Sequence, residues 1–423
     1  MKYSIVIPTY NNCEKYLKPC IDSIIKYTDM TDVELVVSAN GCTDNTFEYL
    51  RYLKTAIPHL VIAWDADPLG YSKATNIGIN FCTADKIILL NNDTVLLDQV
   101  KNYWVDVFDQ AFNNPKCGIS CIIKGMSEPA GRDFAVFFCV MIHRKVFDKI
   151  GLLNEEYGVG GGEDTEFCIE AEKAGFEVIE VLNKTWEGFQ YVGGFPIYHK
   201  GEGTMHDPDL VQGWDNIFLR NSLKLAKKYN YDWYRWRLSN HWERAVFLKG
   251  DQIFPREVTR YQYASQNLLG TKVLEIGCSS GYGIQFFPKD IDYTGLDYDP
   301  IIIDVAKEQD WGYKANFVNA DINKFCLEQY DTIVAFEVIE HLDNGLEVVE
   351  RLKQHCKRLL ITVPMNEPFG FWGPHHKLHG LNESHFPGFK FHYINEAGAI
   401  SNTPDRITQS NPCNLMICRW DDE

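Results

Sequence analysis

Short runs of Val, Ile and Leu alternate with spacers of helical length along most of this chain, and the alternation occurs in two separate series. The first series lies between Tyr3 and about Leu182 and consists of SIVIP, VELVVS, LVIAW, KIILL, GISCII and FEVIEV. The second begins near Lys272 with KVLEIG, IDYTGLD, ANFVNAD, YDTIVAFE and RLLITVP. Alternation of this kind is typical of α/β sheets, in which helices connect and cover the strands. The 423 residues are therefore predicted to hold two α/β domains.

The region between the two series predicts how the domains are joined. Residues 215–229 have a helical pattern, and residues 231–241 are dense in Trp, Tyr and Arg. Aromatic density of this kind favours packing at a domain junction over a flexible Gly/Ser linker. We predict one domain over residues 1–235, an aromatic-rich junction over 236–254 and a second domain over 255–423.

Charge and apolar content limit the function classes. The chain has 58 Asp and Glu against 41 Lys and Arg, a formal charge of -17 that disfavours binding to nucleic-acid phosphates. Its thirteen cysteines include no C-x-x-C pair, which favours a reducing compartment. The longest apolar stretch, residues 134–142, is about half the length of a membrane span, and no signal-peptide pattern opens the sequence. We expect a cytoplasmic protein whose contact with membranes is at most peripheral.

Polar residues follow several predicted strands of the first domain. Thr9 follows the first run, Asn40 ends the second, and Asp93 comes shortly after KIILL. Ligands of open α/β sheets bind at the carboxyl ends of such strands. A carboxylate there suits a hard divalent cation that holds a diphosphate. A single Asp in this place is more often a turn residue, so Asp93 gains weight only from further signals.

A further signal is the sequence GGGEDTEF at residues 160–167. It sets the carboxylates of Glu163 and Asp164 behind a glycine run, at the start of a helix predicted to reach about Ala174. Acidic residues in a first helical turn also complement the helix dipole, and this simpler explanation has near-even weight for the two residues alone.

In their order and spacing, these segments resemble the family 2 glycosyltransferases, which have the nucleotide-diphospho-sugar transferase (GT-A) fold. The resemblance covers about residues 2–230. It depends on SIVIPTYNN, NGCTDNT, PLGYSKATNIGI, LLNNDT, VMIHRKVFDKIGLLNE, GGEDTEF and YHKG. It implies an inverting transferase that uses a nucleotide-diphospho-sugar donor and a divalent metal ion, Mn²⁺ or Mg²⁺.

The resemblance also implies roles for single residues. Asp164 would be the catalytic base, and Glu163 would orient the acceptor. Asp93, which stands in the place of the family's D-x-D motif, would bind the metal with His199, and His206 competes with His199 for this role. The nucleotide-sugar would be bound by Pro8, Thr9, Tyr10, Asn40, Asn76, Asn91, Asn92 and Asp93.

The second domain opens on KVLEIGCSSGYG, a strand that passes through a glycine loop into a predicted helix. Its glycines at 277, 281 and 283 do not form a dinucleotide-binding pattern, and a tight strand-to-helix turn would explain them equally well. Asp297 follows Gly277 by twenty residues, at the end of the next predicted strand, where a carboxylate can accept both hydroxyls of a ribose. This spacing favours a nucleoside-binding site over a simple turn.

With Asp321 in NADI and with FEVIEHL after a fourth strand, the domain resembles the class I S-adenosylmethionine-dependent methyltransferases, which have a Rossmann-like fold. The resemblance covers about residues 255–420, and PREVTRYQYA before the first strand is similar to small-molecule and sugar methyltransferases. It implies that S-adenosylmethionine is bound by Glu275, Gly277, Ser279, Gly281, Asp297, Asp321 and Ile322. Ser279 stands where the family commonly has glycine.

The histidines of the second domain are less informative. His341 is the candidate base for methyl transfer, because an imidazole suits proton transfer near neutral pH, although a hydrogen-bonded core histidine is slightly favoured. A second group could line the acceptor site or bind a metal, but its spacing matches no metal signature and a polar loop is the favoured interpretation. This group is His375, His376, His379 and His385.

We therefore expect a bifunctional enzyme that joins a metal-dependent glycosyltransferase to a methyltransferase. Its substrates would be a nucleotide-diphospho-sugar and a glycan or lipid-linked glycan, and the methyltransferase would act on the same product in surface polysaccharide biosynthesis. A first alternative is methylation of an unrelated small molecule or protein. A second is that one domain is a catalytically inactive binding module, for which the departures Ala39, Asn91 and Ser279 would argue. The donor sugar, its base, the acceptor and the methylated position are not readable from the sequence.

Overall fold

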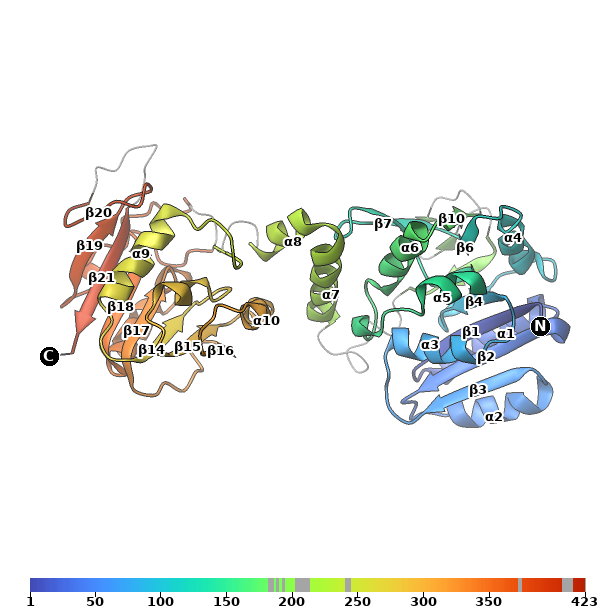
Figure 1. The fold of residues 1–423 in the computed structure, drawn as a ribbon. Helices are drawn as coiled ribbons and strands as arrows, with labels where there is room; N and C mark the ends of the chain where they lie inside the picture. The colour runs from blue at the N-terminus through green and yellow to red at the C-terminus, as the bar shows by residue number, and fades with distance from the viewer. Residues whose placement is uncertain are drawn as a thin grey trace. The chain divides into compact units, whose positions relative to one another are not determined.

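The chain folds into two compact units, Met1–Arg235 and Trp236–Glu423 (Figure 1). The structure is a computed structural model and describes residues 1–181, 186–187, 190–191, 195–201, 214–239, 245–371, 375–404 and 414–422. Each unit contains its own main sheet, as the two series of apolar runs predicted.

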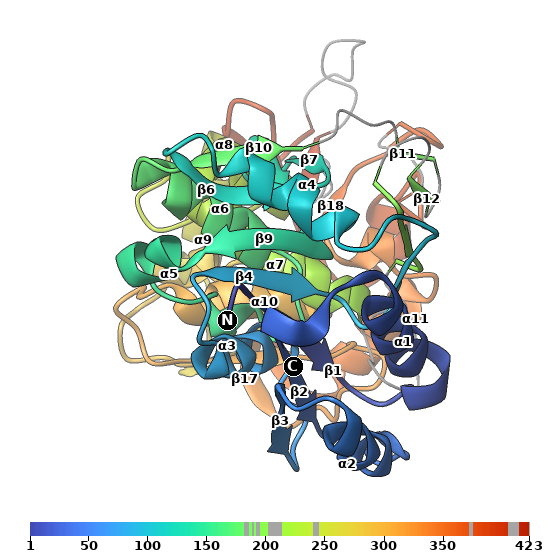
Figure 2. The same ribbon diagram turned by 90° about the vertical axis from the view of Figure 1, so that its right-hand side faces the viewer.

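The main sheet of the first unit has seven strands in the order β10-β6-β9-β4-β1-β2-β3. Figure 2 shows β9, β4, β1, β2 and β3 in this order from top to bottom. The strands β1 to β4 are parallel, and β9 runs antiparallel between β4 and β6. All six predicted runs form strands of this sheet, and β9 adds a seventh. Their bounds are β1 Tyr3–Thr9, β2 Val33–Asn40, β3 Leu60–Asp65, β4 Lys86–Leu90, β6 Cys117–Cys121, β9 Cys139–His143 and β10 Glu177–Glu180.

Helices cover both faces of this sheet. Strand β1 is buried throughout, with Ile5 and Ile7 in one apolar cluster and Val6 in another, since successive side chains of a strand point to opposite faces. Helices α1 (Lys18–Tyr27), α2 (Thr46–Ala56) and α4 (Tyr103–Ala111) supply the first cluster. Helices α3 (Tyr71–Phe81), α5 (Arg144–Ile150) and α6 (Glu163–Lys173) supply the second.

Two further features of this unit bear on the site. Strand β5 (Thr94–Leu96) pairs antiparallel with β13 (Ile197–His199) in a second, small sheet that also contains β11 (Trp186–Glu187) and β12 (Gln190–Tyr191). The helix predicted over 215–229 is confirmed as α7 (Trp214–Tyr229), and the aromatic stretch after it forms α8 (Tyr231–Leu238), which contains the boundary between the two units after Arg235. A hairpin of β7 (Lys124–Ser127) and β8 (Arg132–Ala135) completes the unit.

The second unit is built on an eight-stranded sheet in the order β16-β15-β14-β17-β18-β21-β19-β20. Strands β14 to β18 are parallel, and β21 is antiparallel to β18. The five predicted runs form these five parallel strands. The bounds are β14 Lys272–Ile276, β15 Asp292–Asp297, β16 Ala315–Asn319, β17 Tyr330–Phe336, β18 Cys356–Pro364, β19 Lys390–Ile394, β20 Ile400–Ser401 and β21 Leu415–Asp421.

In the described part of the second unit, this sheet is flanked by the α-helices α9 (Pro255–Gln266), α10 (Pro300–Glu308) and α11 (Gly345–Lys353). The prediction of a helix directly after the glycine loop is wrong for an α-helix: residues Tyr282–Phe286 form only a short 3₁₀ helix. Pro288 follows, and proline disfavours helical backbone at the residue before it, so Phe287 is extended and ends the turn.

None of the helices in the described ranges combines the length and apolar character that crossing a membrane requires. The twelve cysteines in the described part of the chain are all free thiols.

Two candidate active sites

The carboxyl ends of three neighbouring strands meet at one edge of the first sheet, because β4, β1 and β2 are adjacent and parallel. Asn92 lies just beyond β4, and its side-chain amide donates a hydrogen bond to Thr9 Oγ1 at 2.8 Å. Asn40, at the end of β2, donates to the Thr9 carbonyl at 2.9 Å. Pro8 is the last residue but one of β1, and Tyr10 follows that strand. The structure thus brings these five predicted donor-site residues to one edge.

Asp93 and His199 are 106 positions apart in the sequence, and yet they lie side by side. The pairing of β5 with β13 aligns His199 with Thr94, so that His199 Nε2 lies 3.2 Å from Asp93 Oδ1. Both side chains are almost fully buried, and the imidazole stacks on the ring of Phe138 with 4.4 Å between centroids. Nε2 of His199 has no hydrogen-bond partner among the described residues.

This pair fits a divalent cation. A carboxylate oxygen and an imidazole nitrogen are ordinary ligands for Mn²⁺ and related ions, and a buried nitrogen without a hydrogen bond is costly unless a ligand satisfies it. His206, the competing candidate, lies outside the described residues.

The carboxylates of Glu163 and Asp164 lie at the start of α6, as predicted. The glycines at 160–162 all have positive φ, and Gly162 (φ 138°) faces the ring of Tyr157 so closely that any side chain would collide with it. Glu163 is buried, whereas Asp164 is only half-buried and accepts a hydrogen bond from the Thr165 N–H at 2.7 Å. Asp164 is therefore the more accessible of the two carboxylates.

Burial raises the pKa of both carboxyl groups above their ordinary values, and the neighbouring Asp164 raises the pKa of Glu163 further. A raised carboxyl pKa is the usual signature of a group that can exchange protons near neutral pH.

The segment Phe137–Phe138 links the carboxylates to the Asp93–His199 pair. Tyr71 donates its hydroxyl to the Phe137 carbonyl at 3.1 Å, and Phe138 carries the stacked imidazole of His199. Burial raises the pKa of Tyr71, and Glu163, Asp164 and Asp93 raise it further. All three carboxylates therefore lie within electrostatic range of the same tyrosine.

Two predicted donor-site residues, Asn76 and Asn91, are not part of the hydrogen bonds that join Thr9, Asn40 and Asn92. Asn76 is buried in α3, and both N–H groups of its amide donate, to the Leu153 carbonyl at 2.8 Å and to Glu155 Oε1 at 3.0 Å. Its observed contacts hold the 153–155 segment. Asn91 Oδ1 is buried and has no hydrogen-bond partner in the described ranges. A contact of either residue with the donor stays a prediction.

We predict that Glu163→Gln makes the stability of the protein less dependent on pH. Because burial raises the folded-state pKa of Glu163 above the ordinary 4.5, the unfolded chain loses this proton before the folded one does. The wild-type free energy of unfolding should therefore fall as the pH rises from about 4.5 through the raised folded-state pKa, by at most about 1.4 kcal/mol per pH unit from this group. Urea unfolding at pH 5 and pH 8 measures the slope, which the variant should reduce. Glu48→Gln on α2 is the matched control, and an unchanged slope in Glu163→Gln would contradict the assignment.

In the second unit, the predicted cofactor residues follow β14, β15 and β16, which are neighbours in the sheet. Asp297 ends β15 and is buried; its carboxylate accepts the Ser279 N–H and the Asp299 N–H, each at 3.1 Å. The Gly277 N–H donates to the Leu296 carbonyl at 2.8 Å. The glycine loop and Asp297 therefore form one connected structure.

Ser279 has the left-handed backbone (φ 49°) that usually requires glycine. Its hydroxyl donates to the Ala245 carbonyl at 3.0 Å, and that of Ser280 donates to the Phe247 carbonyl at 2.6 Å. Gly281 also has a positive φ (76°), and a side chain there would collide with Phe317. The serine in the place of the family's glycine is thus accommodated by a hydrogen bond of its own.

The other cofactor candidates differ in their surroundings. Glu275 is buried in β14 and accepts the hydroxyls of Tyr261 and Tyr293, while burial raises its pKa to about 7. Asp321 follows β16 and is half-exposed, and Ile322 beside it is buried. The register of β15 and β16 places both near the end of β15, where an adenine next to the ribose would lie.

His341 lies beyond β17, in the short 3₁₀ helix Ile339–His341. Burial and the neighbouring His376 lower its pKa to about 4, so the imidazole is neutral at pH 7 but a weak base. Its role as the base of methyl transfer stays a prediction.

Two contacts near His341 were not predicted from the sequence: Glu337 pairs with Arg260, and His376 and Glu340 meet beside His341. The FEVIEHL motif and the histidines at 375–385 can be read from the sequence, but only the fold shows that they lie together.

Comparisons with known proteins bear on both units. Residues 4–113 match the family model described as glycosyl transferase family 2, and residues 274–358 match a methyltransferase domain model.

Several known proteins are similar to parts of the chain. Glycosyltransferase GlyA of Streptococcus pneumoniae is 30% identical over 157 residues, which are 37% of this chain and 22% of GlyA. The O-antigen biosynthesis protein RfbC of Myxococcus xanthus is 24% identical over 217 residues, 42% of this chain and 16% of RfbC. The ubiquinone biosynthesis O-methyltransferase of Actinobacillus pleuropneumoniae is 28% identical over 116 residues, 25% of this chain and 48% of that protein.

The chain spans less than half the length of each of these relatives. Both matches fall where the sequence predicted them. The predicted fold class, a GT-A fold followed by a Rossmann-like class I methyltransferase fold, is confirmed.

Proposed function

We propose that this chain, which joins a family 2 glycosyltransferase domain to a methyltransferase domain, is a bifunctional cytoplasmic enzyme of surface polysaccharide biosynthesis. The first domain would transfer a sugar from a nucleotide-diphospho-sugar to a glycan hydroxyl, and the second would methylate an oxygen of the same glycan. The observation that carries the proposal is the Asp93–His199 pair, with 3.2 Å between His199 Nε2 and Asp93 Oδ1; Asp93, Glu163 and Asp164 all lie within electrostatic range of Tyr71. The likeness to an O-antigen biosynthesis protein supports a glycan product.

On the donor side, the strand-end residues would hold the nucleotide-sugar. Asn92, Thr9 and Asn40 are already fixed to one another by hydrogen bonds, so they present a preorganised edge to the nucleotide. A divalent cation, held by Asp93 and His199, would supply Lewis-acid stabilisation of the negative charge on the departing diphosphate.

On the acceptor side, Asp164 would take the proton of the attacking hydroxyl, because it is the more accessible carboxylate and has a raised pKa. Glu163, buried behind it, would orient the acceptor. One base and a direct displacement imply inversion at the anomeric carbon.

In the second domain, Asp297 would accept the ribose hydroxyls of S-adenosylmethionine, and the loop from Gly277 to Gly281 would enclose its methionine part. The acceptor hydroxyl would attack the methyl carbon as the carbon–sulfur bond breaks, and S-adenosylhomocysteine would leave. The protein's main task in such a displacement is alignment of the two reactants.

We predict that Asp93→Ala weakens both metal and donor binding by at least about tenfold, because the cation and the diphosphate share this carboxylate. Titration of nucleotide-sugars with and without Mn²⁺ or Mg²⁺ measures the effect. Asp133→Ala, on the exposed side of β8, is the control and should bind as the wild type does. Wild-type donor binding of full strength without any metal would refute the assignment.

The experiment that tests the whole proposal uses the full chain with a panel of nucleotide-sugars, a glycan acceptor and labelled S-adenosylmethionine. We expect one donor to release its nucleoside diphosphate and the glycan to gain the methyl label only after sugar transfer. Label in a protein or small molecule but never in a glycan would favour unrelated methylation. No release from any donor would favour an inactive binding module.

A further inference from the structure

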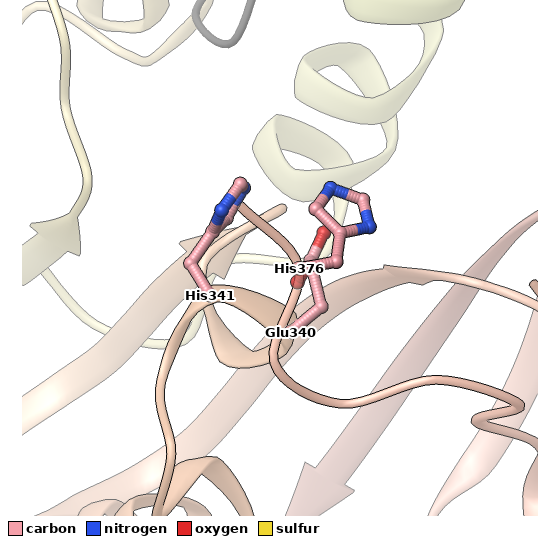
Figure 3. A group of neighbouring side chains, drawn as sticks. All are labelled: Glu340, His341 and His376. Atoms are coloured by element: carbon pink, nitrogen blue, oxygen red, sulfur yellow. The ribbon is translucent and has the colours of Figure 1, made fainter. Parts of the chain in front are cut away.

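A cluster of ligand-type side chains lies in the second unit, at the turn that follows β17. A carboxylate oxygen of Glu340 and one ring nitrogen each of His341 and His376 all lie within 4.8 Å of one another. Figure 3 shows the three side chains grouped together. Backbone hydrogen bonds fix this arrangement, because the N–H groups of Lys377 and Leu378 both donate to the Glu340 carbonyl, at 2.6 and 3.0 Å.

The carboxylate of Glu340 is buried and has no hydrogen-bond partner within the described ranges. Its residue is fully buried (0% exposed), and neither side-chain oxygen has a hydrogen-bond partner there. Burying a carboxylate without a partner costs several kcal/mol, unless the group is neutralised or binds a cation. Burial accordingly raises the pKa of Glu340 well above its ordinary value. The two oxygens of Glu340 are therefore available to a ligand that the described side chains do not supply.

Both histidines are held through their Nδ1 atoms. His376 Nδ1 lies 2.5 Å from the buried carboxylate of Glu367, and His341 Nδ1 lies 3.3 Å from the His375 carbonyl. Both partners are acceptors, so Nδ1 carries the proton and Nε2 keeps its lone pair. Histidines that bind metals almost always donate their other ring N–H to a carboxylate or a backbone carbonyl in this way.

We propose that Glu340, His341 and His376 form a binding site for a divalent first-row transition-metal ion. One carboxylate and two imidazoles are a common ligand set for Zn²⁺, Fe²⁺ and related ions, and leave coordination positions open. The ligand atoms, now within 4.8 Å of one another, would need to approach by at most about 1–2 Å, because ligands at about 2.1 Å from an ion lie roughly 3–3.5 Å apart. In this proposal His341 is a metal ligand and not the general base of methyl transfer.

The position of the site gives the ion a use, and this step rests on the proposed methyltransferase function. Val338, two residues before Glu340, lies so close to Gly277 that a side chain there would collide with it, so the cluster adjoins the candidate cofactor loop. An ion in an open site lowers the pKa of a bound hydroxyl. The acceptor hydroxyl would release its proton to solvent and attack the methyl carbon. The carbon–sulfur bond would break, and S-adenosylhomocysteine would leave.

The test is a Co²⁺ titration of the full chain in an Asp93→Ala, His199→Ala background, which removes the ligands of the first unit. Visible absorption and equilibrium dialysis should show one Co²⁺ per chain. Glu340→Gln and His376→Gln should each abolish this binding, and Glu367→Gln should weaken it about 10- to 100-fold. His355→Gln is the control and should still bind one ion, because His355 precedes β18 at the opposite edge of the sheet from the end of β17, which the cluster follows.

Two further measurements separate the outcomes. Co²⁺ should raise the melting temperature of the background protein but not that of Glu340→Gln, because only a folded chain with the site gains from the ion. Circular dichroism and a cooperative thermal unfolding transition without metal show that each variant is folded, and a separate titration measures S-adenosylmethionine binding. Unchanged Co²⁺ binding in folded Glu340→Gln and His376→Gln would overturn the proposal. Loss of Co²⁺ in these variants would establish the site even if no chain binds S-adenosylmethionine, a result that would count only against the methyltransferase function.

Discussion

Asp164→Asn is expected to lower the rate of sugar transfer by about a hundred- to ten-thousandfold, the range that a general base typically contributes. The substitution keeps the shape of the side chain and its hydrogen bond from the Thr165 N–H, but removes the proton acceptor. Donor affinity should stay near the wild-type value, because this carboxylate would act on the acceptor hydroxyl rather than on the diphosphate. Steady-state rates and donor titrations on the same preparation separate these effects.

The matched control for this variant is Asp148→Asn, an exposed position on α5 in the same unit, which should leave the rate unchanged. Loss of donor affinity as large as the loss of rate would contradict the assignment of Asp164, since it would place the carboxylate on the diphosphate instead.

Asp297→Ala is expected to weaken S-adenosylmethionine binding by about a hundred- to ten-thousandfold. Two ribose hydroxyls would lose a charged acceptor, and each such hydrogen bond contributes roughly 1.5–3 kcal/mol. The carboxylate also accepts the N–H groups of Ser279 and Asp299, so alanine releases the glycine loop as well. Asp297→Asn keeps one oxygen acceptor and should lose less affinity than alanine. Calorimetric titration measures both.

Asp292→Ala at the other, exposed end of β15 is the control and should bind the cofactor normally. An unchanged dissociation constant in Asp297→Ala would mean that the cofactor does not bind at the end of this strand.

Much of the fold could be predicted because its strands are buried on both faces and therefore appear as continuous apolar runs. β1 and β14 are examples, and the polar residues that follow them are placed at one edge by the parallel order of the strands. For this reason, the amino-acid sequence alone is enough to assign Thr9, Asn40 and Asp297 to strand ends.

Contacts that depend on long-range pairing could not be predicted in the same way. Asp93 and His199 are neighbours because of a three-residue strand pairing, whose pattern is too short to be recognised, so only the family resemblance indicated that the two residues meet. The meeting of Glu340 with His376 depends on two backbone hydrogen bonds from a loop, and the histidine spacing alone favoured an ordinary polar loop. After the glycine loop, Pro288 keeps Phe287 extended, so a 3₁₀ helix forms there in place of the α-helix that the sequence predicted.

The hydroxyls of Ser279 and Ser280 bind the carbonyls of Ala245 and Phe247, which precede the first helix of the second unit. Phe247 is also buried in the apolar cluster around that helix. A shortened gene for the methyltransferase half should therefore begin before codon 245. If it began at codon 255, the candidate cofactor loop would lose both hydrogen-bond acceptors and the apolar cluster would lose an aromatic ring. We expect the product to aggregate or to fail to retain S-adenosylmethionine on a gel-filtration column.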